Sequence, residues 1–334
     1  MLVHAGGEYR LVGTEINVEE KHQFQARDFR VLPAIDSELQ YSYKKNREGL
    51  FGMHSRTREE TKYDESLLKP KIFGCVNEGN VTNKAIVSAF EGVVSNSSVL
   101  QADGGIRMDD YKERHDYKVT EERTHFFGWK KDRKEQNIGE AIVTDIKSKG
   151  DNIVDTDGIL HLKGTKLSGN IKLRAKEGIV MEAATSEYNF SHSQSGGQFF
   201  MGLNDLAPEI GYRLFSHSTQ VTSQHEEAVS LEGNVLIETG GHLEAQVNID
   251  ADDLTIKAKS ATFKPTYNKH IERENNHTTS FKVSAGLRFD GAKQVISSVN
   301  DFIGKKELNH WIDACDKGLK AYRASKGIKT GVTA

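Results

Sequence analysis

Hydrophobic and polar residues alternate in short runs along residues 233–265, in the segment GNVLIETGGHLEAQVNIDADDLTIKAKSATFKP. Turn residues, Gly240-Gly241 and Asp252-Asp253, separate the runs. This alternation between turn residues predicts short, half-buried β-strands. The runs lie too close together for crossover helices, so we expect the chain to coil upon itself, with strands of successive coils about 4.8 Å apart. The segment therefore predicts a β-solenoid.

A phrase within this pattern, apolar-x-Ala followed by apolar-x-apolar, recurs along the chain and indicates an internal repeat. Its four copies are 76, 73 and 76 residues apart and begin at Phe24, Leu100, Leu173 and Ile249. We therefore predict one β-helix over residues 1–290, built from four super-repeats of roughly 75 residues, each with about two coils. In the third copy, Leu173, Ile179 and Met181 are expected to face the core.

Each phrase is followed by a polar, charged segment that carries tyrosines and a central aromatic–glycine knot. These insertions cover about residues 41–66, 111–137, 188–228 and 267–295. Arms of similar length, with β-forming residues such as Val119 and Thr120, flank the knots. This favours extruded β-hairpins, and disordered loops are the alternative interpretation.

Near the C-terminus the period changes, because apolar residues recur at intervals of three and four from Val295 to Tyr322. This spacing predicts an amphipathic α-helical segment over residues 292–325. A helix laid over the open end of the coil would protect its unpaired strand edge. The start of a following domain, or a docking surface, is the alternative, and residues 326–334 are predicted to be a loose tail.

Composition narrows the class of protein. The net charge is −3 and no basic face is evident, which argues against nucleic acid as a partner. The apolar fraction of 36% is low and fits the thin core of a solenoid. Cys75 and Cys315 imply no disulfide framework. The chain shows no membrane-spanning stretch or signal peptide and begins in mid-pattern, so we expect a piece of a longer polypeptide, or a gene fragment.

Candidate catalytic chemistry is sparse. The thirteen histidines lack the paired spacing of a zinc site, so we predict no metal and no cofactor. Paired carboxylates such as Asp250 with Asp252 or Asp253 serve as acid and base in sugar-cleaving enzymes of β-helical shape, although aspartate is also a common corner residue. No nucleotide-binding or hydrolase motif occurs. We therefore predict a chain that is not an enzyme, with a polysaccharide-acting β-helix enzyme or an inactive gene fragment as alternatives.

Aromatic residues at the predicted hairpin tips are the better functional candidates. Aromatic side chains beside arginine are enriched at binding hot spots. Packing of the same side chains on a neighbouring insertion, or on the flank of the solenoid, is the alternative. The candidate binding residues are Leu50, Phe51, Arg123, Phe126, Phe127, Trp129, Lys130, Phe199 and Phe200.

The segment GNIKLRAKEGIVMEAA (169–184), followed directly by a polar insertion, resembles the haemagglutinin repeats of filamentous haemagglutinin and of contact-dependent growth-inhibition exoproteins. The EGLFG knot at 48–52 is similar to knots in that family. The resemblance covers residues 7–290 and implies a right-handed parallel β-helix. The function it implies is that of an adhesin or of the stalk and toxin-delivery region of a virulence protein.

The resemblance also implies a location and partners. Proteins of this family are secreted by Gram-negative bacteria through a partner outer-membrane transporter, in two-partner secretion, and act at the cell surface. The implied partners are an outer-membrane protein or glycan on a target or host cell. Within residues 1–334 no segment resembles the family's N-terminal secretion domain, and the residues after 330 do not resemble a toxin domain. Its insertions carry more charge and more aromatic residues than the family's usual Ser/Thr runs.

Overall fold

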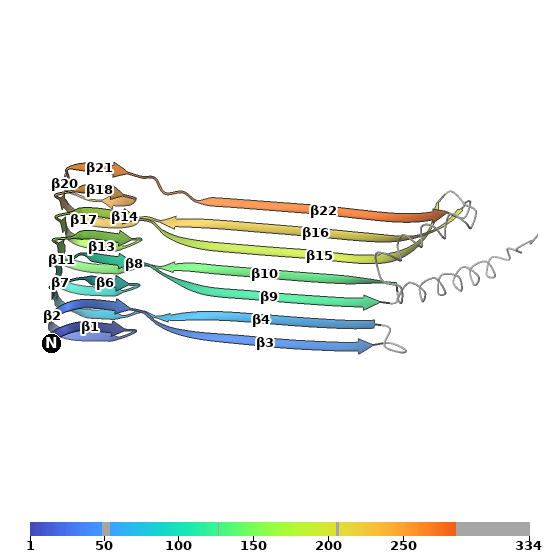
Figure 1. The fold of residues 1–334 in the computed structure, drawn as a ribbon, viewed down its shortest axis with the longest axis horizontal. Helices are drawn as coiled ribbons and strands as arrows, with labels where there is room; N and C mark the ends of the chain where they lie inside the picture. The colour runs from blue at the N-terminus through green and yellow to red at the C-terminus, as the bar shows by residue number, and fades with distance from the viewer. Residues whose placement is uncertain (49–53, 126, 205–206, 285–334) are drawn as a thin grey trace, which may run out of the picture. The chain divides into compact units, whose positions relative to one another are not determined.

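The computed structural model describes residues 1–48, 54–125, 127–204 and 207–284. These residues form 22 strands, without a helix, in two sheets (Figure 1). The chain divides into two compact units, Met1–Gly196 with Phe215–His277 and Gly197–Leu214 with Thr278–Ala334. The predicted helical segment, 292–325, and the tail, 326–334, lie outside the described residues.

The first sheet belongs to the first unit, is parallel throughout and nearly closes on itself, as in a β-helix. Strands of a long wall are β1 (Leu2–Val12), β2 (Glu15–Leu32), β5 (Lys71–Val81), β7 (Glu91–Ala102), β11 (Asp145–Thr156), β13 (Lys166–Ala175), β17 (Val229–Thr239), β19 (Val247–Asp250) and β20 (Leu254–Lys257). Strands of a short wall are β6 (Ala85–Ser88), β8 (Ile106–Asp109), β12 (Ile159–Lys163), β14 (Gly178–Glu182), β18 (His242–Ala245) and β21 (Ser260–Phe263). Strand β2 joins the walls, because it pairs with β5 as far as Ala26 and with β6 from Phe29. This confirms an all-β coil, and its right-handed sense stays a prediction.

The core of the coil consists of ladders of inward side chains. Leu173 lies between Val154 and Ile237, each one turn of the coil away. On the short wall, Ile179 lies between its partners in the same way, and with Leu173 and Met181 it has 0% exposed surface. Burial of one such side chain stabilises the fold by about 1.5–3 kcal/mol. The alternation read from the sequence is therefore the alternation between core and solvent.

One ladder of inward-facing side chains is polar in the N-terminal part of the coil. His22, Asn77, Ser98 and Asn152 occupy equivalent positions in successive turns. His22 is 1% exposed, and its Nδ1 donates to Oδ1 of Asn77 over 2.9 Å, which leaves Nε2 to accept from the Tyr9 hydroxyl at 3.4 Å. Burial is the main cause of the lowered pKa of His22.

Tight corners with positive φ connect some turns of the coil directly to the next. They occur at Gly13 (φ 53°), Ala89 (φ 48°) and Gly164 (φ 59°). A Cβ atom on Gly164 would come within 2.4 Å of the Cβ of Ala184, where the chain leaves the coil for a hairpin. Glycine is therefore required at this corner for its backbone angle and for close packing.

The second sheet is built from hairpins that leave the coil, with strand order β22-β16-β15-β10-β9-β4-β3 (Figure 1). Its strands are β3 (Ala34–Glu48), β4 (His54–Leu68), β9 (Tyr111–His125), β10 (Gly128–Ile142), β15 (Ala184–Asn204), β16 (Ala207–Glu227) and β22 (Lys269–Ser284). Strand β4 pairs antiparallel with β3 of its own hairpin and with β9 of the next. The described strands of the insertions are thus ordered and joined to one another, and the end of the fourth predicted insertion, 285–295, lies outside the described residues.

The spacing of the hairpins matches the spacing of the coil. Between β4 and β9 the chain makes two turns of the coil, β5-β6 and β7-β8, and it again makes two turns between β10 and β15. Two turns rise by about 9.6 Å, which is also the width of a two-stranded hairpin. Because the two dimensions agree, successive hairpins come into register and form one continuous sheet.

The hairpin sheet has no core of its own in the described residues. Apart from Ala184, next to the coil, the buried residues of its described strands are all glycines: Gly128, Gly196, Gly197 and Gly211. Charged side chains pair across and along its strands instead, as Lys131 does with Glu122 and Lys62 with Asp64. Such cross-strand pairs each contribute about 0.2–1 kcal/mol.

The fourth copy of the repeated phrase corrects one prediction. The first three copies occupy the same corner of the coil, between the long and the short wall. Ile249, however, pairs with Leu231, one corner earlier in the turn, and the residue equivalent to Leu173 in the last coil is Ile256. The prediction was wrong because inward-facing apolar residues precede both the corner after Ile249 and the corner after Ile256. The two segments therefore have similar sequence patterns.

Candidate binding surface at the second hairpin

The turn of the second hairpin presents two of the predicted aromatic residues. Strand β9 ends at His125 and β10 begins at Gly128, which pairs with His125. Phe127 is 55% exposed and Trp129 is 38% exposed. Phe126, which belongs to the predicted group, lies outside the described residues. The turn therefore offers aromatic surface to solvent.

The binding residues predicted around this turn lie on both faces of the sheet, because side chains alternate between the faces along each strand. Directly opposite residues share a face and consecutive residues alternate. Lys130 lies opposite Arg123, so these two side chains share one face. Trp129 lies opposite Thr124 and belongs to the other face, together with Lys131. The candidate residues thus form two surfaces rather than one.

Arg123 and Lys130 belong to a row of three cations, of which the sequence indicated only these two. Arg56 of β4 lies directly opposite Arg123, on its other side. Arg56 Nη2 and Arg123 Nε both contact Glu121, the former at 2.9 Å. Hydrogen bonds from Arg56 and then from Arg123 lower the pKa of Glu121.

This row keeps an excess of positive charge, since two guanidinium groups share one carboxylate. Lys130 has no ion-pair partner within the described part of the chain. At the outer end of the same face, Nδ1 of His54 lies 3.2 Å from Nδ1 of His125. Arg56 and His54 come from an earlier hairpin, so only the pairing of hairpins brings them here, and no local motif could have indicated them.

One candidate aromatic residue of the third hairpin, Phe200, packs against a glycine. In the second unit, a Cβ on Gly211 would come within 2.5 Å of the Phe200 ring, and the Arg213 guanidinium lies 5.5 Å from the centre of that ring. Phe199 is half-buried. Ring packing over glycine stabilises a β-sheet locally. Phe200 therefore stabilises the sheet by packing. Leu50 and Phe51 of the first hairpin lie outside the described residues.

The carboxylates considered for sugar cleavage lie on exposed surface. Asp250 ends β19, and Asp252 and Asp253 form the bend before β20. The carbonyl of Asp253 accepts a hydrogen bond from the N–H of Val235 over 2.8 Å. This is the arrangement of corner residues.

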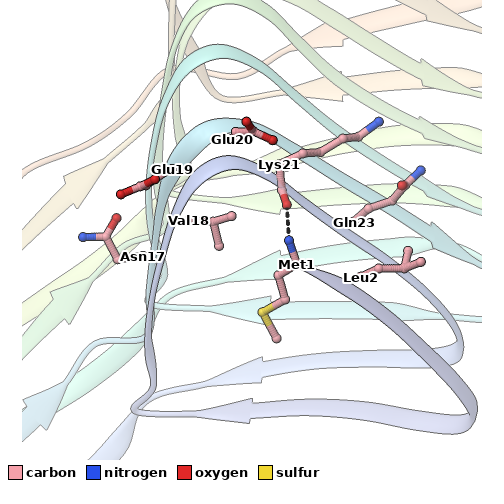
Figure 2. A pocket seen from close by; sticks show the side chains of 8 residues that line it. All are labelled: Met1, Leu2, Asn17, Val18, Glu19, Glu20, Lys21 and Gln23. Carbon is pink, nitrogen blue, oxygen red and sulfur yellow. Dashed lines mark hydrogen bonds between the residues drawn. The ribbon is translucent and has the colours of Figure 1, made fainter.

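A hollow of about 600 Å³ lies at the N-terminal coil (Figure 2). The N-terminal ammonium of Met1 donates to the carbonyl of Lys21 over 2.6 Å, and the side chains of Glu19, Glu20 and Lys21 point apart from one another (Figure 2). Across the residues that the structure describes, no three His, Cys, Asp or Glu side chains are placed to hold a metal ion. These residues also include no helix long and apolar enough to cross a membrane.

Comparison with protein families gives a match over residues 128–206, to the family model described as hemagglutinin repeat. The chain contains a haemagglutinin repeat. In the structure this repeat runs from β10 through β11, β12, β13 and β14 into β15. It therefore comprises the return strand of one hairpin, two turns of the coil and the outgoing strand of the next hairpin.

Comparison of the chain with curated proteins and with solved structures gave no match. The haemagglutinin repeat is typical of non-enzymatic proteins and indicates a filamentous-haemagglutinin-like region of a secreted or surface protein.

Proposed function

We propose that this chain is a non-catalytic segment of a secreted bacterial exoprotein, in which the coil is a rigid stalk and the hairpins bind a cell surface. The exoprotein would be an adhesin or the delivery region of a toxin. The haemagglutinin repeat over residues 128–206 supports this class of protein. Export by a Gram-negative bacterium through an outer-membrane transporter belongs to the same proposal.

The observation that carries the proposal is the turn of the second hairpin. Exposed Phe127 and Trp129 lie at this turn, and Arg56, Arg123 and Lys130 form a row next to it, on the face of the sheet opposite to that of Trp129. Aromatic rings supply contact area, and guanidinium groups form directed hydrogen bonds to carboxylate or phosphate. This combination fits an acidic glycan or an acidic patch of an outer-membrane protein on the target or host cell.

The test is binding of the purified, fluorescently labelled chain to intact Gram-negative cells and to host cells. We expect the double variant Phe127→Ala/Trp129→Ala to bind at least tenfold more weakly than the unaltered chain, because the exposed aromatic surface is removed. Lys130→Glu should also weaken binding, and more so at low salt.

Tyr267→Ala provides the control, because Tyr267 is 67% exposed but lies between the last coil and β22. It should bind like the unaltered chain. If the Phe127/Trp129 variant keeps the β-sheet circular dichroism spectrum and binds equally well, the second hairpin is not the binding surface.

A further inference from the structure

Two histidines lie on the same face of the hairpin sheet as Arg56, Arg123 and Lys130. His54 precedes Arg56 by two residues on β4, and His125 follows Arg123 by two residues on β9. Every second side chain of a strand lies on the same face, so each histidine shares the face of its arginine. Both histidines and both arginines are exposed. All four side chains are therefore accessible to a ligand from outside the chain.

These four side chains form a two-by-two basic array on neighbouring strands. Arg56 is the backbone partner of Arg123. The histidines meet at the outer end of the same face, where Nδ1 of His54 lies 3.2 Å from Nδ1 of His125. Neighbouring strands are about 4.8 Å apart, and alternate residues of one strand are about 7 Å apart. A small anion above the basic array can therefore contact several of its N–H donors at once.

One carboxylate lies within this face and only partly neutralises it. Glu121 contacts Nη2 of Arg56 and Nε of Arg123. The remaining N–H groups of both guanidinium groups have no acceptor among the residues that the structure describes. Asp132, opposite Glu121 on β10, is already bonded to His192. The outer end of this face therefore keeps an excess of positive charge and unused donors.

The two histidines make this excess depend on pH. Histidine is the side chain whose charge ordinarily changes between about pH 5 and 8. A hydrogen bond between the two Nδ1 atoms requires one of them to be unprotonated, so this bond is lost when both rings are charged. On this face, Glu48 of β3 is the backbone partner of His54, a glycine of β10 is the partner of His125, and the two arginines follow at the next position inward. Acidification therefore adds positive charge and frees N–H donors in the basic array.

We propose that the basic array binds a phosphate group of a phosphorylated glycan at the cell surface, with His54 and His125 as ligand-contacting residues. This inference rests on the proposed function, because it assigns a ligand class to the surface at the second hairpin. A phosphate monoester carries a charge of about −1.5 to −2 at neutral pH and has three strong acceptor oxygens. The carboxylate of an acidic protein patch has two oxygens, which a single guanidinium can satisfy. The number of donors and the excess charge therefore favour phosphate.

Two charged polymers with the same sugar backbone test the ligand class. Dextran phosphate and carboxymethyl dextran of equal charge density are titrated onto the immobilised full chain. We expect at least tenfold tighter binding of dextran phosphate at about pH 6, because phosphate engages arginines and histidines together. Equal affinity for the two polymers would overturn the phosphate assignment. Tighter binding to vesicles containing phosphatidic acid than to dextran phosphate would overturn the assignment to a glycan.

A histidine variant tests whether the rings take part. His54→Gln/His125→Gln keeps N–H donors at both positions but cannot gain charge. We expect this variant to bind dextran phosphate at least fivefold more weakly than the unaltered chain at about pH 6, and equally well at about pH 8. His192→Gln, at the junction of the second and third hairpins, is the matched control and should change neither affinity. A loss of the same size at both pH values, or no loss at the lower one, contradicts the role of the histidines.

Cell binding distinguishes this proposal from the proposed function. Binding of the unaltered chain to cells, without a preference for dextran phosphate, overturns the phosphate site and leaves the second hairpin as a binding surface. A preference for dextran phosphate that depends on His54 and His125, without binding to cells, supports the phosphate site and contradicts the proposed function. Circular dichroism of each variant shows whether the β-sheet is retained, so a loss of affinity can be assigned to the altered side chains.

Discussion

In the coil, every second side chain of a strand enters a shared core, and Leu173, Ile179 and Met181 have no exposed surface. In the hairpin sheet of the same chain, the buried residues of the described strands are glycines and one alanine beside the coil. Both regions stack strands at the same distance of about 4.8 Å. They differ in the force that stabilises the stack, which is apolar burial in the coil and backbone hydrogen bonding with cross-strand charge in the sheet.

The comparison shows how a sheet without a core can be ordered. An isolated two-stranded hairpin is marginally stable in water. Here each hairpin leaves a rigid coil, and two turns of the coil match the width of one hairpin. The coil therefore fixes the position of each hairpin next to its neighbour, and the sheet requires little stabilisation of its own.

The largest expected effect is the loss of stability when a buried apolar side chain of the coil is shortened, compared with the same change in the hairpin sheet. Leu173→Ala should destabilise the chain by about 2–5 kcal/mol, because it removes fully buried methyl groups and leaves a cavity. Val119→Ala, in the half-buried hairpin strand β9, should cost less than about 1 kcal/mol. Denaturant unfolding of both variants measures the difference in the free energy of unfolding, and equal losses would show that the two regions are stabilised in the same way.

A second prediction concerns the tight corner beneath a hairpin exit. Gly164→Ala should cost about 1–3 kcal/mol, because Gly164 has φ of 59° and a Cβ there would approach Ala184. Gly7→Ala is the control, since nothing lies within 4 Å of a Cβ at that position. Thermal unfolding should show a lower Tm for the first variant and little change for the second.

The polar ladder of the core, which contains His22, predicts that the stability of the chain depends on pH. Burial lowers the pKa of His22 below its usual value of about 6.5, so the unfolded chain takes up a proton at a higher pH than the folded chain does. Stability should therefore be fully present above about pH 6.5 and fall as the pH drops below it, by up to about 1.4 kcal/mol per unit. His22→Asn keeps an amide that can bond Asn77 and should remove this part of the dependence.

The smallest expected effect belongs to the sheet. Arg56→Ala should lower the free energy of unfolding by about 0.2–1 kcal/mol at low ionic strength and by less in high salt. The reason is that Arg56 of β4 forms a hydrogen bond with Glu121 of the neighbouring strand β9. The pKa of Glu121 is lowered, so the stability from its charge is present above about pH 4.3 and is lost as the pH falls through the folded-state value. Salt-independent loss would indicate that packing, and not charge, holds the hairpins together.

The alternation of apolar residues predicted the coil, since Leu173, Ile179 and Met181 face its core as expected. It also placed the fourth phrase at the wrong corner, because Ile249 lies in the same kind of local pattern as Ile256. A period of two residues reports the face of a strand but not which wall the strand belongs to.

The candidate binding surface was predicted less completely. Phe127 and Trp129 were found from their place in the aromatic–glycine knot, and both are exposed. Arg56 was missed, because it comes opposite Arg123 only through pairing of two hairpins. That pairing depends on the rise of the coil between the hairpins, which is a property of the whole stack and is not visible in either segment.

Two deletions test whether the match between two coil turns and one hairpin keeps neighbouring hairpins paired. Removing residues 71–90 joins Pro70 to Glu91, the residue paired with Lys71, and leaves one coil turn between the first two hairpins. Removing residues 71–144 joins Pro70 to Asp145, which occupies the same position in the stack, and again leaves two turns before the next hairpin.

Hydrogen exchange of the β4 peptide, residues 54–68, measures whether β4 still pairs with its neighbouring hairpin. We expect the smaller deletion to expose the outward amides of β4 to rapid exchange, whereas the larger deletion should leave them protected as in the unaltered chain. Protection that survives removal of residues 71–90, or is lost equally in both variants, would contradict this expectation.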